Sequence, residues 1–539
     1  MKTIIDHVTV WTGVPDATGT VVTETAIAFD EHGVIAVGPA ALGIDADERV
    51  DGAGGFLCHA FGDGHAHPLF GGLEEQFAPV REATTWAGIA DAVGTWAAAH
   101  PDVEWIRGEG FDSTLAPSGV FHAAWLDARV PDRPVVLRAT DYHTVWVNSV
   151  ALERAGIRRG VVQPHDGEIV LDDAGDPIGT LREWGAWRPV YDLLPPVELD
   201  TRLAAIRTAS RVMAESGIAW VQDAWVEQPD VDGWIAAAAS GDLGFRVDLG
   251  QWADPNTWRD QCPAFVESRA RVEALGSPLL TARTVKFFAD GVIESGTGAL
   301  LEPYCDCPHS KGLPNWTRDE LIAAVTAVDA LGFNPHIHAI GDAAARMALD
   351  AIEAAIATNP PRDRRPVIAH AQLVDAADLA RFARLGVTAN FEPFWAKRDA
   401  LMTELTEPRL GPERTAQQYR IRSLLDLGSR VSFGSDWPVT TVSPLAGIQV
   451  AVTRQVHGEG EAFIPEERIS VDEALLAYTR GVAIQRGDDA GGTVRVGAPA
   501  DLVLLTADPR TVPAGRIDAI EVRGTWVGGA VRHLSPTLG

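Results

Sequence analysis

A regular alternation of strand-like and helix-like segments runs through the middle of this 539-residue chain. Short runs of β-branched and aromatic residues follow stretches with apolar residues at helical spacing, and several of those stretches end at glycine. This alternation is typical of a parallel sheet, whose strands are joined by helices. We predict eight strands, at residues 55–67, 218–226, 245–249, 284–288, 336–339, 366–370, 387–391 and 430–434.

Helices are predicted in several of the intervals, at residues 202–216, 319–331, 343–357, 376–385 and 420–427. Eight strand–helix units favour a closed (β/α)8 barrel, a TIM-like fold of the α/β class. A doubly wound open sheet is the alternative, because it also contains parallel strands joined by helices.

Two further regions lie outside the alternation. About 150 residues separate the first strand from the second, far more than one connection needs, so residues 75–200 are predicted to form an inserted lobe. Both chain ends contain short strand-like runs separated by glycine and proline. We therefore predict a composite β-sandwich domain from residues 1–57 and 487–539, and a barrel from residues 58–486.

The composition limits the partners. The formal charge of −29 and the pI near 4.8 argue against binding to nucleic acid or to an anionic membrane, both of which require a basic face. No apolar run approaches the roughly 20 residues that span a bilayer. We expect a cytoplasmic protein with a small-molecule substrate, no nucleic-acid partner and no membrane partner, and we leave self-association into a homo-oligomer open.

Polar side chains occur at the ends of five predicted strands, where burial is costly without a reason. They are His65 and His67, Lys286, His336 and His338, His370, and Asp436. Residues i and i+2 of a strand share a face, so the paired histidines can reach one ion. Barrels of this type place their active sites at the carboxyl ends of the strands.

Each of these residues also has a purely structural interpretation. His370 could be a hydrogen-bonded core histidine, Asp436 could cap a loop, and Lys286 could pair with Asp290. Taken together, the histidines and the carboxylate without a thiolate favour zinc or another borderline divalent ion. The chain has only four lysines, at positions 2, 286, 311 and 397, and one of them stands within an apolar strand.

Five motifs resemble the amidohydrolase superfamily, and more narrowly its amidohydrolase 3 branch, which includes N-substituted formamide deformylases and YtcJ-like proteins. They are GDGHAHP, TVKFFADG, HIHAIGDAA, IAHAQLV and SFGSDWPV. The stretch from Asp141 to Leu152, with His143, resembles a D-G-H-x-x-W-V-N-S-x-A-L sequence of that branch. The tail from Gly497 to Val503 fits the composite β domain of such proteins. The resemblance therefore covers nearly the whole chain.

The resemblance implies a binuclear metal site, most simply of two zinc ions. His65, His67 and Asp436 would hold one ion, and His338 and His370 the other. Lys286 falls at the position of the carboxylated lysine that bridges the two ions in this family. A metal-bound hydroxide would attack a carbonyl carbon, and Asp436 would act as the catalytic base and then as the acid.

Two departures from the family pattern affect the details. The usual P-G-F-x-D start of strand one reads His59-Ala60-Phe61-Gly62-Asp63 here, below the expected ligands. The glutamine–proline pair often found on strand seven reads Glu392-Pro393 and is followed by Phe394 and Trp395. We predict that Glu392, Trp395 and His143 contact the substrate. For His143 a hydrogen-bonded lobe histidine is an equal alternative.

These patterns predict a metal-dependent hydrolase of a carbon–nitrogen bond other than a peptide bond, in a linear amide, an N-acyl amine or an N-formyl amine. One alternative is a deaminase or cyclic-amide hydrolase on the same barrel, although Lys286 favours the binuclear hydrolase. The other alternative is a non-catalytic scaffold with the same fold, which would be expected to have lost some ligands.

Overall fold

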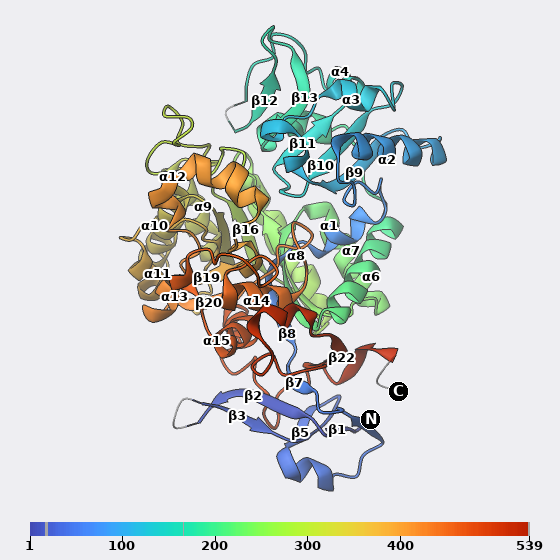
Figure 1. The fold of residues 1–539 in the computed structure, drawn as a ribbon, viewed down its shortest axis with the longest axis vertical. Coiled ribbons are helices and arrows are strands. Elements are labelled where there is room, and N and C mark those ends of the chain that lie inside the picture. The colour runs from blue at the N-terminus through green and yellow to red at the C-terminus, as the bar shows by residue number, and fades with distance from the viewer. Residues whose placement is uncertain (17–19, 165, 537–539) are drawn as a thin grey trace.

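The computed structural model describes residues 1–16, 20–164 and 166–536. Its centre is a sheet of eight parallel strands, each hydrogen-bonded to the next in chain order, which confirms the predicted barrel (Figure 1). The strands are β8 (Phe61–Ala66), β14 (Ile218–Val226), β15 (Arg246–Trp252), β16 (Leu280–Phe288), β17 (Asn334–Ala339), β18 (Val367–His370), β19 (Thr388–Phe391) and β20 (Arg430–Phe433). Buried residues dominate these strands, as expected for a sheet covered on both faces.

The barrel closes where its first and last strands end. The Asp436 amide donates a hydrogen bond to the His65 carbonyl (2.8 Å), and the His67 amide donates one to the Trp437 carbonyl (2.7 Å). The buried Asp63 carboxylate also accepts a hydrogen bond from the Ser435 amide (3.0 Å). These contacts bring the predicted ligands of β8 and the loop after β20 together at the carboxyl end of the barrel.

Helices follow most of the strands and pack around the sheet. They include α6 (Leu199–Glu215), α7 (Gln228–Ser240), α8 (Trp258–Leu275), α9 (Arg318–Ala330), α10 (Asp342–Thr358), α11 (Leu379–Leu385), α13 (Ile421–Asp426) and α14 (Pro444–Thr453). Helices α7 and α8 are not among the predicted helices, because their apolar residues are only weakly segregated to one face. Both end at a glycine in the left-handed conformation, Gly241 and Gly276, which satisfies the last carbonyl groups of the helix.

Strands from the two ends of the chain share one sheet. Its order is β23 (Ala530–Leu534), β22 (Val522–Val527), β21 (Leu502–Leu505), β7 (Phe56–His59), β2 (Thr9–Pro15) and β3 (Val21–Glu24). A second sheet consists of β5 (Gly33–Val37), β4 (Ile27–Asp30), β1 (Thr3–Asp6) and β6 (Glu48–Asp51). A common apolar core from both sheets lies between them. The domain boundaries given above stay a prediction.

The expected first strand, residues 55–67, is in fact two strands. Residues of β7 pair with β21 in the terminal sheet, whereas β8 pairs with β14 in the barrel. The break falls at Ala60, whose amide donates a hydrogen bond to the Asp501 carbonyl. The continuous apolar run could not reveal this break, because both halves are buried.

The interval between β8 and β14 contains a separate five-stranded sheet, at one end of the molecule in Figure 1. Its strands are β12 (Glu168–Leu171), β13 (Pro177–Arg182), β11 (Thr144–Val147), β10 (Val135–Ala139) and β9 (Ile106–Phe111). Helices α2 (Trp86–Ala99), α3 (Ala123–Asp127), α4 (Ser149–Arg154) and α5 (Trp184–Tyr191) accompany it. We call this region the lobe. Among the described residues, no helix combines the length and apolarity needed to cross a membrane.

Candidate metal centre

Three predicted ligands converge at the carboxyl end of β8. The Asp436 Oδ1 atom lies 2.9 Å from His67 Nε2 and 3.6 Å from His65 Nε2. Ligand atoms of all three residues lie within 4.8 Å of one another, and all three side chains are buried. The i, i+2 spacing of His65 on β8 and His67 just after it, together with the backbone hydrogen bonds that close the barrel, produces this arrangement.

The chemistry of this group suits a divalent cation. Asp436 Oδ1 is buried and, within the described part of the chain, accepts no hydrogen bond. Burial lowers the pKa of His65, His67, His338 and His370 below the usual value of 6.5, so the imidazoles are neutral, the form that binds metal. Neutral ring nitrogens directed at an unpaired carboxylate oxygen are the donors that zinc and similar ions prefer.

Lys286 extends from β16 into the same site. Its side chain is fully buried, and Nζ lies 3.4 Å from His65 Nε2 and 4.5 Å from the centre of the Phe288 ring. Burial lowers the pKa of Lys286 from 10.5 to about 7. The structural alternative of an ion pair between Lys286 and Asp290 does not hold, because the Asp290 carboxylate accepts hydrogen bonds from backbone amides instead.

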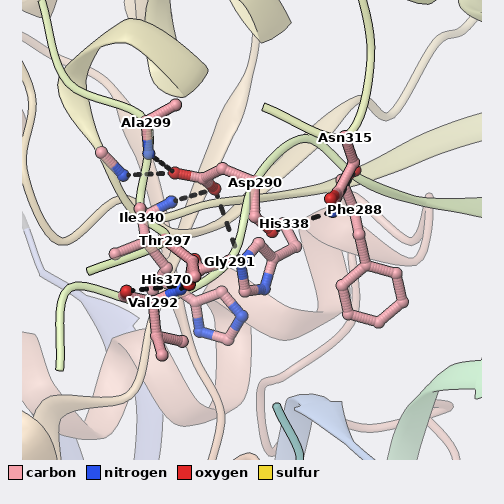
Figure 2. A network of polar contacts seen from close by, with 12 residues as sticks. Phe288, Asp290, Gly291, Val292, Thr297, Ala299, Asn315, His338, Ile340 and His370 are labelled. Carbon is pink, nitrogen blue, oxygen red and sulfur yellow. Dashed lines mark hydrogen bonds and ion pairs between the residues drawn. The ribbon is translucent and has the colours of Figure 1, made fainter. Parts of the chain in front are cut away.

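Asp290 instead supports His338, as Figure 2 shows. Its carboxylate accepts hydrogen bonds from the amides of Ala299 (2.7 Å), Ile340 (3.0 Å) and Gly341 (2.9 Å). His338 Nε2 lies 3.1 Å from the Gly291 carbonyl and 3.6 Å from Asp290 Oδ1. This ring nitrogen is therefore occupied, and Nδ1 of His338 is the one available to a metal ion.

The two histidines of β17 have different positions. His336 Nε2 lies 2.8 Å from His65 Nδ1, and the His336 side chain is fully buried within the barrel. His336 therefore orients His65. His338 lies two residues nearer the carboxyl end of β17 and faces the cavity. That His338 rather than His336 is the metal ligand stays a prediction.

His370 on β18 completes the group. Its ring centre lies 4.6 Å from those of both His65 and His338. Its Nδ1 lies 2.8 Å from Glu392 Oε2, and Trp395 stacks on the ring at 5.2 Å. Trp395 lines the cavity, and its contact with the substrate stays a prediction, whereas Glu392 does not line the cavity. The buried Glu392 lies behind His370 and orients it, so we correct its predicted role as a substrate contact.

Backbone strain marks two of these positions. His370 and Asp436 have φ values of 70° and 53°, in the left-handed region that side chains other than glycine avoid. Such strain is commonly found at functional sites, where the surrounding structure compensates for it. Here the strained turns direct both side chains toward the common centre.

A cavity of about 160 Å³ opens beside the ligands. Apolar and aromatic side chains from the barrel, the lobe and the segment after β19 form most of its wall. They include Tyr142, Trp225, Phe288, Val292, Phe394, Trp395, Leu401 and Met402. The site therefore combines a polar group of ligands with a mainly apolar wall, an arrangement typical of small-molecule sites.

The lobe contributes His143 to this wall. His143 Nδ1 lies 2.8 Å from Glu183 Oε2, and its ring centre is 5.4 Å from that of His338. Burial alone would lower the pKa of His143, but the charge of Glu183 and its hydrogen bond outweigh burial and raise this pKa to about 9. Both interpretations of His143 hold geometrically, because it is hydrogen-bonded within the lobe and also lines the cavity.

Sequence reasoning missed several residues around the site. Glu183 and Trp225 lie in the lobe and on β14, and neither stands in a motif with ligand spacing. The sequence suggests Asp290 only as a partner of Lys286. Its position four residues after that lysine, in the quoted TVKFFADG motif, was the available signal.

Comparison with known protein families gives one family match. The model of the amidohydrolase family matches residues 48–533. The protein LONG AFTER FAR-RED 3 of Arabidopsis thaliana is 30% identical over 481 residues, which cover 87% of this chain and 80% of the relative. The putative amidohydrolase YtcJ of Bacillus subtilis is 28% identical and covers 90% of both chains. An N-substituted formamide deformylase of Arthrobacter pascens is 26% identical and covers 80% of both.

Solved structures agree with the fold. An uncharacterized metal-dependent hydrolase from Pyrococcus furiosus superposes with a TM-score of 0.71 at 23% identity, covering 95% of this chain and all of the other. Its counterpart from Pyrococcus horikoshii gives 0.73 at 22%, covering 96% and 99%. An adenosine deaminase from Xanthomonas campestris with bound zinc gives 0.56 at 12%, covering 100% and 94%. At these low sequence identities, the structural similarity is evidence for the fold alone.

Proposed function

Because this chain belongs to the amidohydrolase family, we propose that it is a metal-dependent hydrolase of a carbon–nitrogen bond other than a peptide bond. The observation that carries the proposal is the convergence of two imidazoles and one carboxylate within 4.8 Å at the carboxyl end of the barrel. The formamide deformylase among its relatives acts, by its name, on such a bond. The alternative of a non-catalytic scaffold predicts a broken ligand set, whereas these three side chains lie together and are buried.

We further propose which residues hold the ions. His65, His67 and Asp436 would hold one divalent ion, and His338 and His370 a second. Lys286, whose Nζ lies next to His65, would bridge the two as its carbamate. A lysine buried among apolar residues favours the neutral amine, which can take up carbon dioxide, whereas an arginine stays charged and cannot. We propose zinc because the donors are nitrogen and oxygen atoms.

The bound metal would supply a polarised carbonyl group and a water of lowered pKa. Proton transfer and substrate orientation would fall to residues of the chain. The Asp436 carboxylate would accept a proton from the attacking water and return it to the leaving nitrogen. The apolar wall excludes bulk water and orients the substrate, which strengthens electrostatic interactions at the reacting group.

The cavity also suggests the kind of substrate. Trp225, Phe288 and Trp395 form an apolar wall next to the ligands, and this wall suits an aromatic or branched aliphatic substituent. We propose a linear N-formyl or N-acyl amine that bears such a substituent. The cavity, about 160 Å³ in volume, suits a small-molecule substrate.

Metal analysis and hydrolysis assays test the proposal. The zinc-loaded protein should contain up to two ions per chain and should hydrolyse N-benzylformamide or a related N-acyl amine. Asp436→Asn should keep the fold and lower kcat by about 10²–10⁴-fold, the usual contribution of a general acid–base group. A protein that binds no zinc, or an Asp436→Asn variant with full activity, would contradict the proposal.

The carbamate has its own test. Lys286→Ala should lose metal and activity, and short carboxylic acids such as acetate or propionate should restore part of both by occupying the bridging position. Lys286→Arg keeps a positive charge but cannot form the carbamate, so it should be inactive and should not respond to acetate. Unchanged activity in either variant would rule out the bridging role.

A further inference from the structure

Glu183 has an unusual backbone conformation for a side chain of its kind. It follows β13 in the lobe and has φ and ψ values of 61° and 166°, a region that is essentially restricted to glycine. Only 4% of the residue is exposed. A buried glutamate with a strained backbone persists only where contacts with the surrounding structure hold it in place.

These contacts join the lobe to the barrel. The Glu183 amide donates a hydrogen bond to the His143 carbonyl (2.9 Å), and Glu183 Oε2 lies 2.8 Å from His143 Nδ1. The other carboxylate oxygen, Oε1, accepts a hydrogen bond from the hydroxyl of Thr297, in the barrel loop after β16. Glu183 thus holds His143 at both its main chain and its ring, and fixes this pair to the barrel.

The anchoring loop is the one that holds His338. A Cβ atom added at Gly291 would lie 2.2 Å from Glu183 Oε1 and from Thr297 Oγ1, so the glycine makes room for the carboxylate. The carbonyl of the same Gly291 faces His338 Nε2 at 3.1 Å. Glu183 and His338 are therefore positioned by one turn, although they come from the lobe and the barrel.

His143 is the member of this group that faces the cavity. Its Nδ1 is occupied by Glu183, which leaves Nε2 as the ring nitrogen able to contact a ligand. The ring lies 5.4 Å from that of His338 and 6.4 Å from that of Phe288, both of which also line the cavity. A substrate bound next to His338 would therefore lie beside His143.

We propose that His143 hydrogen-bonds the amide group of the substrate through Nε2, and that Glu183 is the positioning residue that holds His143 for this contact. The inference rests on the proposed function, because it adds a lobe-derived contact to the same site. It does not involve the metal ligands themselves, so the Glu183 and His143 variants should bind metal normally.

The first test uses binding and needs no turnover. Imidazole ¹⁵N NMR of the zinc-loaded protein, with the His143 signals assigned by their loss in His143→Gln, should show a shift of Nε2 on saturation with benzamide. Glu183→Gln should change the Nδ1 signal and weaken benzamide binding by about tenfold. The matched control is Glu168→Gln, a lobe carboxylate on the neighbouring strand that pairs with Arg182 at the surface. The Glu168→Gln control should leave the His143 Nδ1 signal and the affinity for benzamide unchanged.

The second test uses kinetics with N-benzylformamide. His143→Gln and Glu183→Gln should each lower kcat/KM by about tenfold or more at unchanged zinc content, and the double variant should be no worse than His143→Gln alone, because the two residues act as a unit. Additive losses, or loss of zinc in Glu183→Gln, would overturn the inference. So would His143 signals that do not respond to benzamide. A wild-type protein that hydrolyses no amide would refute the proposed function, and the NMR result would still decide the inference.

Discussion

Four of the histidines around the cavity share one feature at the scale of single residues. His65, His338, His370 and His143 each have one ring nitrogen next to a buried partner, namely His336, the Gly291 carbonyl, Glu392 and Glu183. Such partners fix the tautomer and the ring orientation, so that the second nitrogen points to the ligand. The site thus depends on residues that never touch the substrate as well as on the ligands.

The strain at Glu183 yields a prediction for stability. Glu183→Gly and Glu183→Ala both remove the carboxylate, but only alanine keeps a Cβ atom in the unfavourable backbone region. The glycine variant should therefore be more stable by about 1–2 kcal/mol, the reverse of the usual order. Chemical denaturation of both variants measures the difference.

The same pair of substitutions at Glu168 is the control. Glu168 lies on the neighbouring strand β12, outside the positive-φ positions, so alanine there should be at least as stable as glycine. An alanine variant at position 183 that matches or exceeds the glycine variant would show that the backbone of Glu183 is not strained.

At the scale of elements, the site depends on the seam between β8 and β20. Hydrogen bonds from the loop after β20 hold Asp436 next to His65 and His67. Gly434 lies at this seam, where an added Cβ would be 2.7 Å from the His65 amide nitrogen and 3.0 Å from Asp63 Oδ1. The absence of a side chain at position 434 allows the two strand ends to approach.

Gly434→Ala should therefore separate the ligands. We expect it to lower the free energy of unfolding by about 1–3 kcal/mol, as overpacking does, and to weaken zinc binding in addition. Gly43→Ala is a suitable control, because an added Cβ there has no atom within 4 Å and the φ of Gly43 is not left-handed. Thermal unfolding and zinc titration measure the two effects. Normal zinc affinity in Gly434→Ala would show that the seam tolerates separation.

At the scale of the whole molecule, the lobe and the barrel form the cavity together. The lobe supplies Tyr142 and His143, and the barrel supplies the ligands and Trp225. Trp184 of the lobe packs against Trp252 of β15, with ring centres 4.6 Å apart. Glu227, which directly precedes α7, lies at this junction. Burial raises its pKa, and the opposing effects of Arg138 of the lobe and Trp225 are smaller. The pH dependence of stability is therefore a test of how this junction is buried.

Burial raises the pKa of Glu227 from 4.5 to about 7. Between these values the folded state holds a proton that the unfolded state has lost, so this residue lowers the stability as the pH rises from about 4.5 to 7. Glu227→Gln removes this titration. The free energy of unfolding of the variant, measured relative to that of the wild type, should be about 1–3 kcal/mol higher at pH 8 than at pH 5.

Denaturation at both pH values checks this prediction. Glu198→Gln serves as the control, because Glu198 occupies the corresponding position before α6 but is exposed. It should show little pH-dependent difference from the wild type. An equal effect of Glu227→Gln at pH 5 and pH 8 would mean that Glu227 titrates normally in the folded protein.

The sequence by itself predicted the barrel as the favoured fold, and it predicted the candidate ligands. Periodicity and glycine stops are local, so they located most of the eight strands, and the i, i+2 spacing placed His65 and His67 on one face. The scarcity of lysine drew attention to Lys286, which is buried next to His65. These conclusions needed only the chain's local geometry and the cost of burying polar groups.

Only the tertiary structure decided how distant residues meet. The role of Glu392 behind His370, the link from Glu183 to Thr297, and the break at Ala60 all depend on contacts between elements far apart in the chain. No spacing encodes such contacts, because the distance between two side chains from different elements is set by the packing of those elements. The sequence therefore supplied the candidate ligands, and the fold decided which partners lie next to them.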